Sequence, residues 1–343
     1  MNKTAIYLLL FFAIALAAWF GINSIDTNTL NKTTAAFALT DTAAVTKIII
    51  EDNEGRKLQL DRKNGWWQVN RGYKARPDAV ERVLMTLIKL QVKYPIGKDA
   101  YESTMKNFED PIRRVSIFKE DSTQASKVYL LGGAPHTRKG TYMMLEGTED
   151  PYVVHLLGHD GHLMTRFFTI PETWRDRMLM NYKASDIAGV KVEYPHFEES
   201  SFELKAIADS FEVESLGGKV AIAASEKLNK PVTIQFLKSF ENVYLEGFEN
   251  SYPHIDSVRA SKPFAILTIT PKKGKEQKLT VHYMPINRRS KLQVDENGRD
   301  VPFDVDRFFA FINDGKDFVL IQRRSFEGIF KRLEHFYYTP VVE

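Results

Sequence analysis

The sequence predicts an α+β protein with two tandem repeated units of mainly antiparallel sheet and flanking helices, behind one N-terminal transmembrane helix. Three observations predict this class. Residues 5–22 are uniformly apolar, short alternating segments bounded by turn residues fill the remainder, and the second half repeats the pattern of the first. We therefore expect a membrane anchor over residues 1–22, a linker over 23–40, a first unit over 41–183 and a second unit over 184–343.

The apolar run extends from Ala5 to Ile22 without a charge or a proline. A helix of this length rises about 1.5 Å per residue and just spans a hydrocarbon core of about 30 Å. Lys3 precedes the run, and positive charge keeps that end cytoplasmic, so we expect a single-pass anchor in a bacterial inner membrane with the rest in the periplasm. A cleaved signal peptide is the alternative, but its small-residue triplet at residues 15–17 lies inside the run, whereas cleavage sites follow it.

The amino-acid composition limits the classes of protein and the kinds of site that the sequence can encode. The chain has 343 residues, 43% of them hydrophobic and 12% aromatic, which is globular and long enough for two cores. The absence of Cys excludes disulfides, thiolate metal sites, cysteine nucleophiles and a lipid-modified cysteine anchor. With 47 basic and 44 acidic residues, the charge is too balanced to predict a nucleic-acid partner. Residues 23–40 are rich in Thr, Asn and Ser and are typical of a linker.

The first unit begins with a βββα pattern. The β-branched run Ile48-Ile49-Ile50 ends in a turn, Leu58 and Leu60 alternate with polar residues, and a turn at Gly65 leads into a third strand at residues 66–69. Pro77 opens a helix whose apolar residues recur at three- and four-residue steps as far as Leu90. A strand near Val92 and a more polar helix follow.

The second unit repeats this pattern. Val190 and Val192 take the places of Ile48 and Ile50, 142 residues later, and a helix through Ile234, Leu237 and Phe240 matches Leu84, Leu87 and Leu90 at a separation of 150. The turn at Asp314-Gly315 matches Asp160-Gly161 at 154. The separation grows slowly, as small loop insertions would make it, and this predicts an internal duplication.

Later segments continue each unit. We expect strands at 115–118, 127–131, 141–145 and 152–156, with counterparts at 265–270, 278–284, 291–294 and 307–312. We also expect a helix from Pro171 to Tyr182 that joins the units, and a terminal helix from Ser325 to Phe336.

Several of these segments carry a family resemblance. The run FALTDTAAVTKIII at 37–50, the turn before Gly65-Trp66-Trp67, the Pro77-Asp78 helix start and Trp174-Arg175-Asp176 resemble the bacterial family called domain of unknown function 4340. Residues 306–311 and 316–320 resemble its longer, membrane-anchored members. The resemblance implies an envelope protein, because many members lie beside parts of an ABC-type transporter similar to the gliding-motility auxiliary system. It implies no catalytic or ligand-binding residues.

One histidine cluster has spacing that suits a metal. His155, His159 and His162 would share a face of a continuous helix and could then hold zinc, as in a metal-assisted hydrolase. Gly158 and Asp160-Gly161 interrupt that helix, however, and Asp-Gly between apolar runs is typical of a hairpin. We therefore predict no metal site, no cofactor and no catalytic residues.

Possible contacts with a partner or an anion are Arg288, Arg289 and Trp66. Of three arginine pairs (the others are 113–114 and 323–324), Arg288-Arg289 lies beside Asn287 and Ser290 and has the composition of a loop, where both forks can face one acidic group. Trp66 and Trp67 face opposite sides of a strand, and comparison with Ser210-Phe211 places Trp67 in the core and Trp66 outside. Solvated loop charges and ordinary packing are the alternatives.

These features favour a non-enzymatic, membrane-anchored periplasmic accessory or scaffold protein of a bacterial envelope assembly, possibly associated with an ABC transporter or gliding motility. The expected partners are the inner membrane, through Ala5 to Ile22, and a protein of that assembly. The alternative is a binding module for cell-wall glycan or a lipid head group that uses the basic loop and Trp66.

Overall fold

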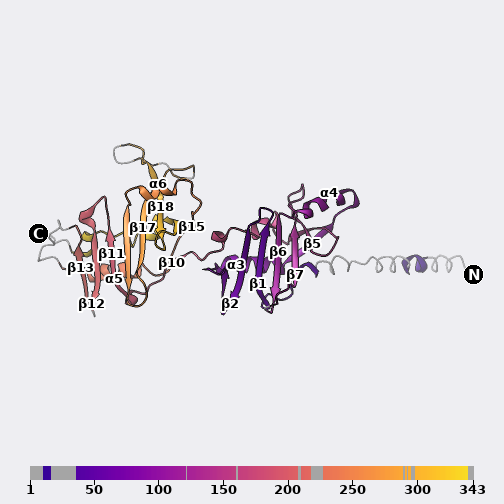
Figure 1. Ribbon diagram of the computed structural model, residues 1–343, viewed down its shortest axis with the longest axis horizontal. Helices are drawn as coiled ribbons and strands as arrows, with labels where there is room; N and C mark the ends of the chain where they lie inside the picture. The colour runs from indigo at the N-terminus through magenta and orange to yellow at the C-terminus, as the bar shows by residue number, and fades with distance from the viewer. Residues whose placement is uncertain are drawn as a thin grey trace, which may run out of the picture. The chain divides into compact units, whose positions relative to one another are not determined.

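A computed structural model describes residues 11–16, 36–120, 122–159, 161–207, 210–217, 227–288, 290–291, 293–294 and 298–338. The chain divides into two compact units, Met1–Asp176 and Arg177–Glu343 (Figure 1). Each unit contains a mainly antiparallel sheet and a few helices. The predicted sheet-rich α+β class is therefore confirmed.

The first unit is built on a single antiparallel sheet. Its strands are β1 (Val45–Asp52), β2 (Lys57–Lys63), β3 (Trp66–Val69), β4 (Tyr73–Lys74), β5 (Leu90–Pro95), β6 (Arg113–Lys119), β7 (Lys127–Leu131), β8 (Thr141–Leu145) and β9 (Tyr152–Leu156). Within the described residues they lie in the order β4-β3-β2-β1-β6-β7-β8-β9-β5. Two helices, α3 (Pro77–Ile88) and α4 (Lys98–Glu109), flank the sheet.

The start of this sheet follows from local sequence. Ile48 and Ile50 are fully buried and pair with Leu60 and Leu58 across the β1–β2 ladder, because alternate residues of a strand share one face. The β2–β3 turn requires Gly65, whose φ of +81° is unfavourable for other residues. These predicted strands are confirmed.

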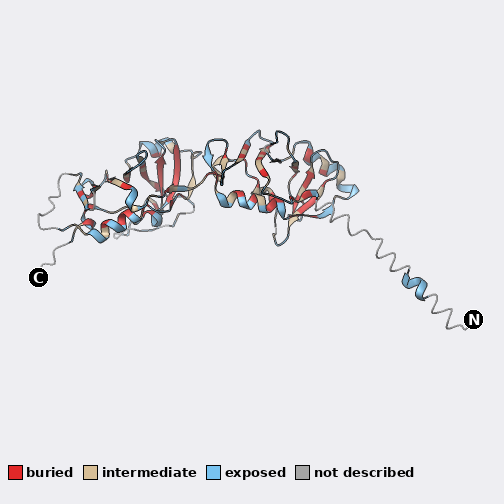
Figure 2. Ribbon diagram, turned by 90° about the horizontal axis from the view of Figure 1, so that it is seen from below, coloured by how far each residue is buried: buried red, intermediate tan, exposed pale blue. Residues whose placement is uncertain are grey.

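Helix α3 covers the apolar face of the sheet. It begins with proline at its first turn, after the extended residue Arg76, and its buried residues include Val80, Val83 and Leu87. Figure 2 shows helices that carry both buried and exposed residues. The helix ends at Ile88, so the expectation that it extends to Leu90 is wrong: Leu90 opens β5 and pairs with Leu156.

Residues preceding β1 also join the first core. Phe37 and Leu39 are only 2% and 3% exposed. The Tyr129 hydroxyl donates to the carbonyl of Phe37 at 2.6 Å, and the N–H of Leu39 donates to the carbonyl of Leu87 at 2.9 Å. The packed part of the first unit therefore includes Phe37.

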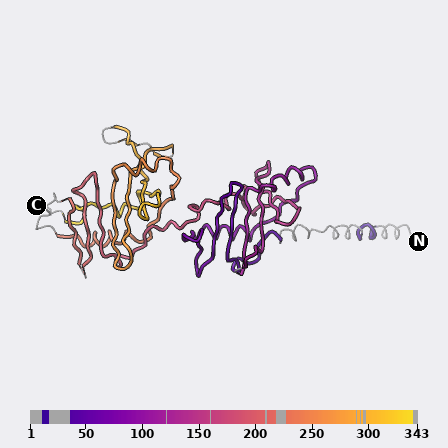
Figure 3. The backbone as a smooth tube through the Cα atoms, viewed as in Figure 1, coloured from indigo at the N-terminus to yellow at the C-terminus, as the bar shows by residue number. Residues whose placement is uncertain are grey.

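The second unit contains a similar sheet. Its strands are β10 (Met178–Met180), β11 (Ile187–Glu193), β12 (Phe202–Ile207), β13 (Ser210–Ser215), β14 (Val243–Tyr244), β15 (Gly247–Phe248), β16 (Ala265–Pro271), β17 (Gln277–Pro285), β18 (Phe303–Ile312) and β19 (Asp317–Gln322). The large sheet has the order β13-β12-β11-β16-β17-β18-β19-β15, and β10 pairs separately with β14. From β3 in the first unit and β13 in the second, the two orders match strand for strand. Figure 3 traces the backbone of both units.

The second sheet is covered on both faces near β18 and β19. Helix α5 (Lys230–Lys238) buries Phe236 and Leu237 in the main core. Helix α6 (Ile255–Ala260) contributes Val258 to a smaller cluster. Because both faces are covered, β18 and β19 have continuous buried runs in place of alternation.

Two predicted helices are wrong. After a 3₁₀ turn at Pro171–Thr173 the chain becomes extended and forms β10, because pairing with β14 satisfies its backbone. The terminal segment is divided into α7 (Arg323–Phe326) and a 3₁₀ turn at Leu333–Phe336. Between them Gly328 approaches Ser239 so closely that an added Cβ would lie 2.9 Å from the Ser239 side chain.

Three predicted equivalences also need correction. Among residues 291, 293 and 294, which the structure describes, Val294 alone forms a bridge, with Asp300, and the strand that occupies the expected place is β18. The turn at Asp314-Gly315 joins β18 to β19, whereas Gly161 follows β9, so the two Asp-Gly turns do not correspond; Asp160 lies outside the described residues. Phe240 lies beyond the end of α5.

The predicted membrane segment, Ala5 to Ile22, lies outside the described residues except for 11–16, which are helical with Phe11 and Phe12 exposed. Among the helices of the described ranges, none combines the length and the apolar character needed to cross a bilayer.

Asp52 links the end of β1 to a distant loop. Its carboxylate accepts hydrogen bonds from the Thr169 hydroxyl at 2.6 Å and from Arg56 Nε at 2.7 Å, and its side chain is fully buried. Burial alone would raise the pKa of Asp52, but these hydrogen bonds outweigh burial and lower the pKa to about 2.

We expect Asp52→Asn to lower the free energy of unfolding by about 3 kcal/mol near neutral pH, because an amide cannot accept all these donors. Since the folded-state pKa lies below the unfolded value of about 4, the difference between the two proteins should shrink as pH falls from 4 towards 2. Urea unfolding across this pH range measures it.

Glu54→Gln is the matched control, because Glu54 pairs with Arg56 through a side chain that is 66% exposed. We expect this control to cost less than about 1 kcal/mol. Equal effects of the two substitutions would contradict the role assigned to Asp52.

Candidate functional site

Trp66 lines a cavity of the first unit. This cavity, about 810 Å³ in volume, lies between β3 and α3, and Trp67, Leu84 and Met85 also line it. Trp66 is 39% exposed, whereas Trp67 is half-buried, packs against the core and lies under the guanidinium of Arg62 at 4.9 Å. The outer ring therefore presents an aromatic surface next to Met85, which is also exposed.

The predicted basic pair lies in the connection between β17 and β18. Arg288 is exposed, and Arg289 is outside the described residues. The loop is attached to β18 just after the pair: the Ser290 hydroxyl donates to Asp304 Oδ2 at 2.6 Å, and Lys291 Nζ lies 2.7 Å from Asp306 Oδ2. The loop thus reaches the rim of a second cavity, which Lys291 lines.

This second cavity, called here the arginine cavity, has a volume of about 880 Å³. Its basic lining residues are Lys291, Arg307, Arg323, Arg324 and Arg332, its acidic ones Glu246, Asp306 and Glu327, and its aromatic ones Tyr194, Phe197, Phe264 and Phe330. In the described part of the chain, the lining therefore carries more positive than negative charge. A volume of this size suits a ligand pocket.

Strand pairing brings two of the arginines together. Arg307 lies opposite Gln322 in the β18–β19 ladder, and Arg323 follows Gln322 directly at the start of α7. The Arg323 guanidinium lies 5.9 Å from the ring centre of Phe308, and that of Arg332 lies 5.5 Å from the ring of Phe197. Aromatic rings thus support the guanidinium planes while their edges stay available.

The carboxylate of Asp304 holds the side chain of Arg307 in place. The side chain of Asp304 is 1% exposed and accepts hydrogen bonds from Arg307 at 2.8 Å and from the backbone N–H of Asp306 at 2.9 Å. Burial alone would raise the pKa of Asp304, but hydrogen bonds from Arg307 and Ser290 lower it below its usual value. One buried carboxylate therefore orients both an arginine and the basic loop.

Three charged side chains of the cavity have unused hydrogen-bonding or ion-pairing capacity within the described part of the chain. The Oε2 atom of Glu246 is buried and has no hydrogen-bond partner in the described ranges. Arg323 and Arg324 are exposed and form no ion pair with any residue that the structure describes. The site thus offers two free guanidinium forks and one free carboxylate oxygen to a ligand.

The three histidines do not form a metal site. His155 lies on β9 opposite Gln91, His159 follows in a turn, and His162 precedes a 3₁₀ turn that starts at Leu163. Among the described residues, no group of three potential ligands could hold a metal ion.

Sequence reasoning identified the 323–324 pair but not its setting. The prediction selected Arg288-Arg289 because of its loop composition, whereas the structure places Arg323 and Arg324 in a cavity and leaves Arg288 exposed. The contributions of Glu246 and Phe264 depend on long-range strand pairing, and no local pattern reveals them.

Comparison with known proteins identifies the family of the chain. The model of the family described as domain of unknown function 4340 matches residues 67–254, more than half of the chain, from β3 of the first unit to the start of α6 in the second. The protein is a sheet-rich α+β protein that belongs to this family. Neither a curated protein nor a solved structure matches the chain.

We expect Asp304→Asn to lower the free energy of unfolding by about 2 kcal/mol, because it leaves Arg307 without its buried carboxylate. Chemical denaturation measures this loss. Asp306→Asn, which removes an exposed partner of Lys291, is the control and should cost less than about 1 kcal/mol. A larger loss in the control would contradict the central role of Asp304.

Proposed function

We propose that this protein is a non-enzymatic accessory or scaffold protein of a bacterial envelope assembly. In this proposal residues 5–22 anchor it in the inner membrane, and both units lie in the periplasm. The observation that supports it most strongly is that two sheets with the same strand order present different cavities. Such a chain suits the binding of more than one partner.

We also propose that the two units arose by internal duplication. The matching strand orders support this, as do the matching helix positions: in the chain α3 lies between β3 and β5 and α5 lies between β13 and β15, and α4 and α6 each precede the strand that returns to the centre of the sheet. The buried pairs Ile48–Leu60 and Val190–Leu204 occupy the same places in their ladders.

An association with an ABC-type transporter or with gliding motility is the finer form of this proposal. Its support is the resemblance of the chain to family members encoded beside such components. A cell-wall glycan or lipid head-group binding module is the alternative, and the exposed ring of Trp66 in the first cavity favours it, because aromatic rings stack on sugars.

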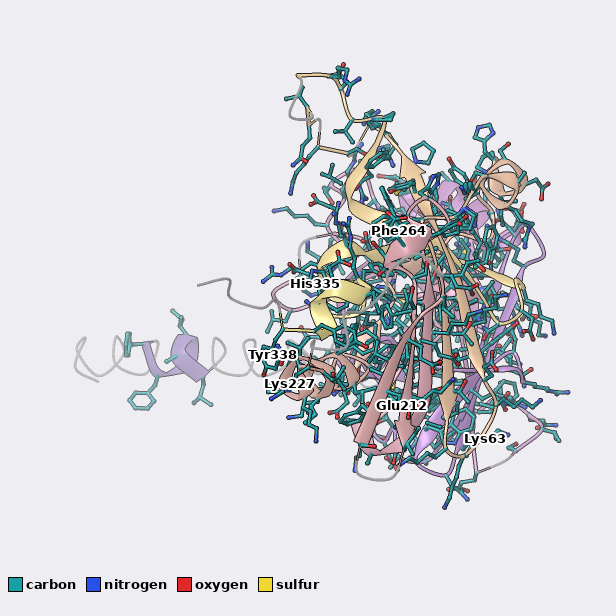
Figure 4. The ribbon with its side chains drawn as sticks, turned by 90° about the vertical axis from the view of Figure 1, so that its left-hand side faces the viewer. Lys63, Glu212, Lys227, Phe264, His335 and Tyr338 are labelled. Carbon is teal, nitrogen blue, oxygen red and sulfur yellow. The ribbon has the colours of Figure 1, made fainter. Side chains whose placement is uncertain are left out.

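The proposed location is tested by cysteine labelling. The chain has no Cys, so Lys63→Cys, at the exposed end of β2 (Figure 4), introduces a single thiol. In spheroplasts we expect a membrane-impermeant maleimide to label this variant without lysis, because residue 63 lies outside the inner membrane. Asn2→Cys is the control and should need lysis. Labelling of Asn2→Cys without lysis, together with labelling of Lys63→Cys only after lysis, would overturn the proposed orientation.

The proposed role is tested by photo-crosslinking in living cells. Benzoylphenylalanine is placed at Glu327 in the arginine cavity, at Trp66 in the first cavity and, as a control, at the exposed turn residue Lys273. We expect protein adducts at the cavity positions that mass spectrometry identifies as subunits of a membrane assembly, and none at Lys273.

The adducts also separate the two proposals. A glycan or lipid adduct at Trp66, with no protein adduct at either cavity, would favour the binding module. No adduct at any position would contradict both.

A further inference from the structure

We propose that the arginine cavity binds an acidic peptide segment of a protein partner. Carboxylates of the peptide would meet Arg323 and Arg324, an apolar side chain would lie against the aromatic wall, and an N–H group would donate to Glu246. This inference rests on the proposed function in one respect, namely that the ligand belongs to a protein partner.

The charges of the cavity fall into two groups. Arg307 pairs with buried Asp304, and Lys291 pairs with Asp306, so these two cations stabilise the walls. Arg323 and Arg324 have no ion pair in the described part of the chain and are exposed at the rim. A guanidinium fork binds a carboxylate through two parallel hydrogen bonds, so a pair of neighbouring forks suits adjacent acidic groups.

The aromatic residues form an apolar wall beside these forks. Phe264, labelled in Figure 4, lies with its ring centre 5.1 Å from that of Phe330 and 5.9 Å from that of Tyr194. Phe264 and Phe330 are only half-buried, so part of their surface faces the cavity. This wall can bury an aromatic or aliphatic side chain of the ligand.

Glu246 selects among anionic ligands. Its buried Oε2 atom lacks a hydrogen-bond donor within the described residues, and a ligand that supplies an N–H removes the cost of that unpaired oxygen. Inorganic phosphate at neutral pH, or the phosphate of an anionic lipid, brings negative charge towards Glu246, Asp306 and Glu327 without an N–H group. A peptide carries both carboxylates and N–H groups, so its chemistry matches the cavity better.

The test uses the full chain in detergent and a fluorescent peptide, acetyl-Glu-Phe-Glu-Phe-Glu-amide, with binding measured by anisotropy. We expect saturable binding, and we expect the Gln-for-Glu version of the peptide to bind at least about tenfold more weakly. The double variant Arg323→Gln with Arg324→Gln should raise the Kd of the acidic peptide by about tenfold or more.

The matched control is Lys272→Gln with Lys273→Gln, which removes the same charge from an exposed turn of the same unit. It should change the Kd by less than about twofold, since distant surface charges are screened. Equal weakening by both double variants, equal binding of the neutral peptide, or no binding at all would overturn the proposal. So would binding to phosphatidylglycerol vesicles without binding to the peptide.

Glu246→Gln tests the proposed contact between the carboxylate of Glu246 and an N–H group of the peptide. We expect the acidic peptide to bind about threefold more weakly and inorganic phosphate to compete with it more effectively, because the repelling charge is gone. Tighter binding of the peptide to this variant would overturn the N–H contact. If the peptide fails to bind but crosslinking at Glu327 still captures a membrane protein, the ligand class is wrong while the scaffold role stands.

Discussion

The path of the chain across the sheet is the constraint on which each unit depends. In the first unit β1, β2 and β3 lead from the centre to one edge, whereas β5 lies at the opposite edge beside β9. The chain must therefore cross one face of the sheet, and α3 lies on this crossing with its apolar side buried. Helix α3 also covers Ile48 and Ile50, which belong to the same buried cluster. This one connection therefore both carries the chain to the opposite edge of the sheet and completes the hydrophobic core. In the second unit α5 lies on the equivalent connection between β13 and β15.

The arginine cavity follows from what happens where β19 ends. Pairing of β18 with β19 fixes Arg307 beside Gln322, and the chain passes directly from that residue into α7. Residues that leave a buried strand reach the rim of the sheet, where charged side chains remain hydrated while their neighbours are packed. Asp304 then compensates the one arginine that lies deeper. The cavity thus combines exposed arginines that follow β19 with a paired arginine on β18.

Local patterns predicted the strands and their turns well because side-chain alternation and turn glycines act over a few residues. The β1–β2–β3 ladder and the start of α3 at Pro77 are examples. The predictions fail where contacts between residues far apart in the sequence determine the local structure. Residues 178–180 have a helical pattern but pair with β14, and the helix expected through residue 336 is interrupted where Gly328 packs on Ser239. For the site, sequence alone identified the arginine pairs, but the choice among them required the register of β18 and β19.

The two units differ in the residues that follow equivalent strands of their sheets, β9 in the first unit and β19 in the second. In the first unit the residues that follow β9 lead to Leu163, which is fully buried and bonds through its N–H to Thr141. In the second unit the residues that follow β19 are Arg323 and Arg324, exposed at a cavity. A change of this kind costs little stability, since surface residues at the end of a strand make few core contacts. Under the proposed scaffold function, two units with matching strand orders could bind separate ligands while each core stays intact.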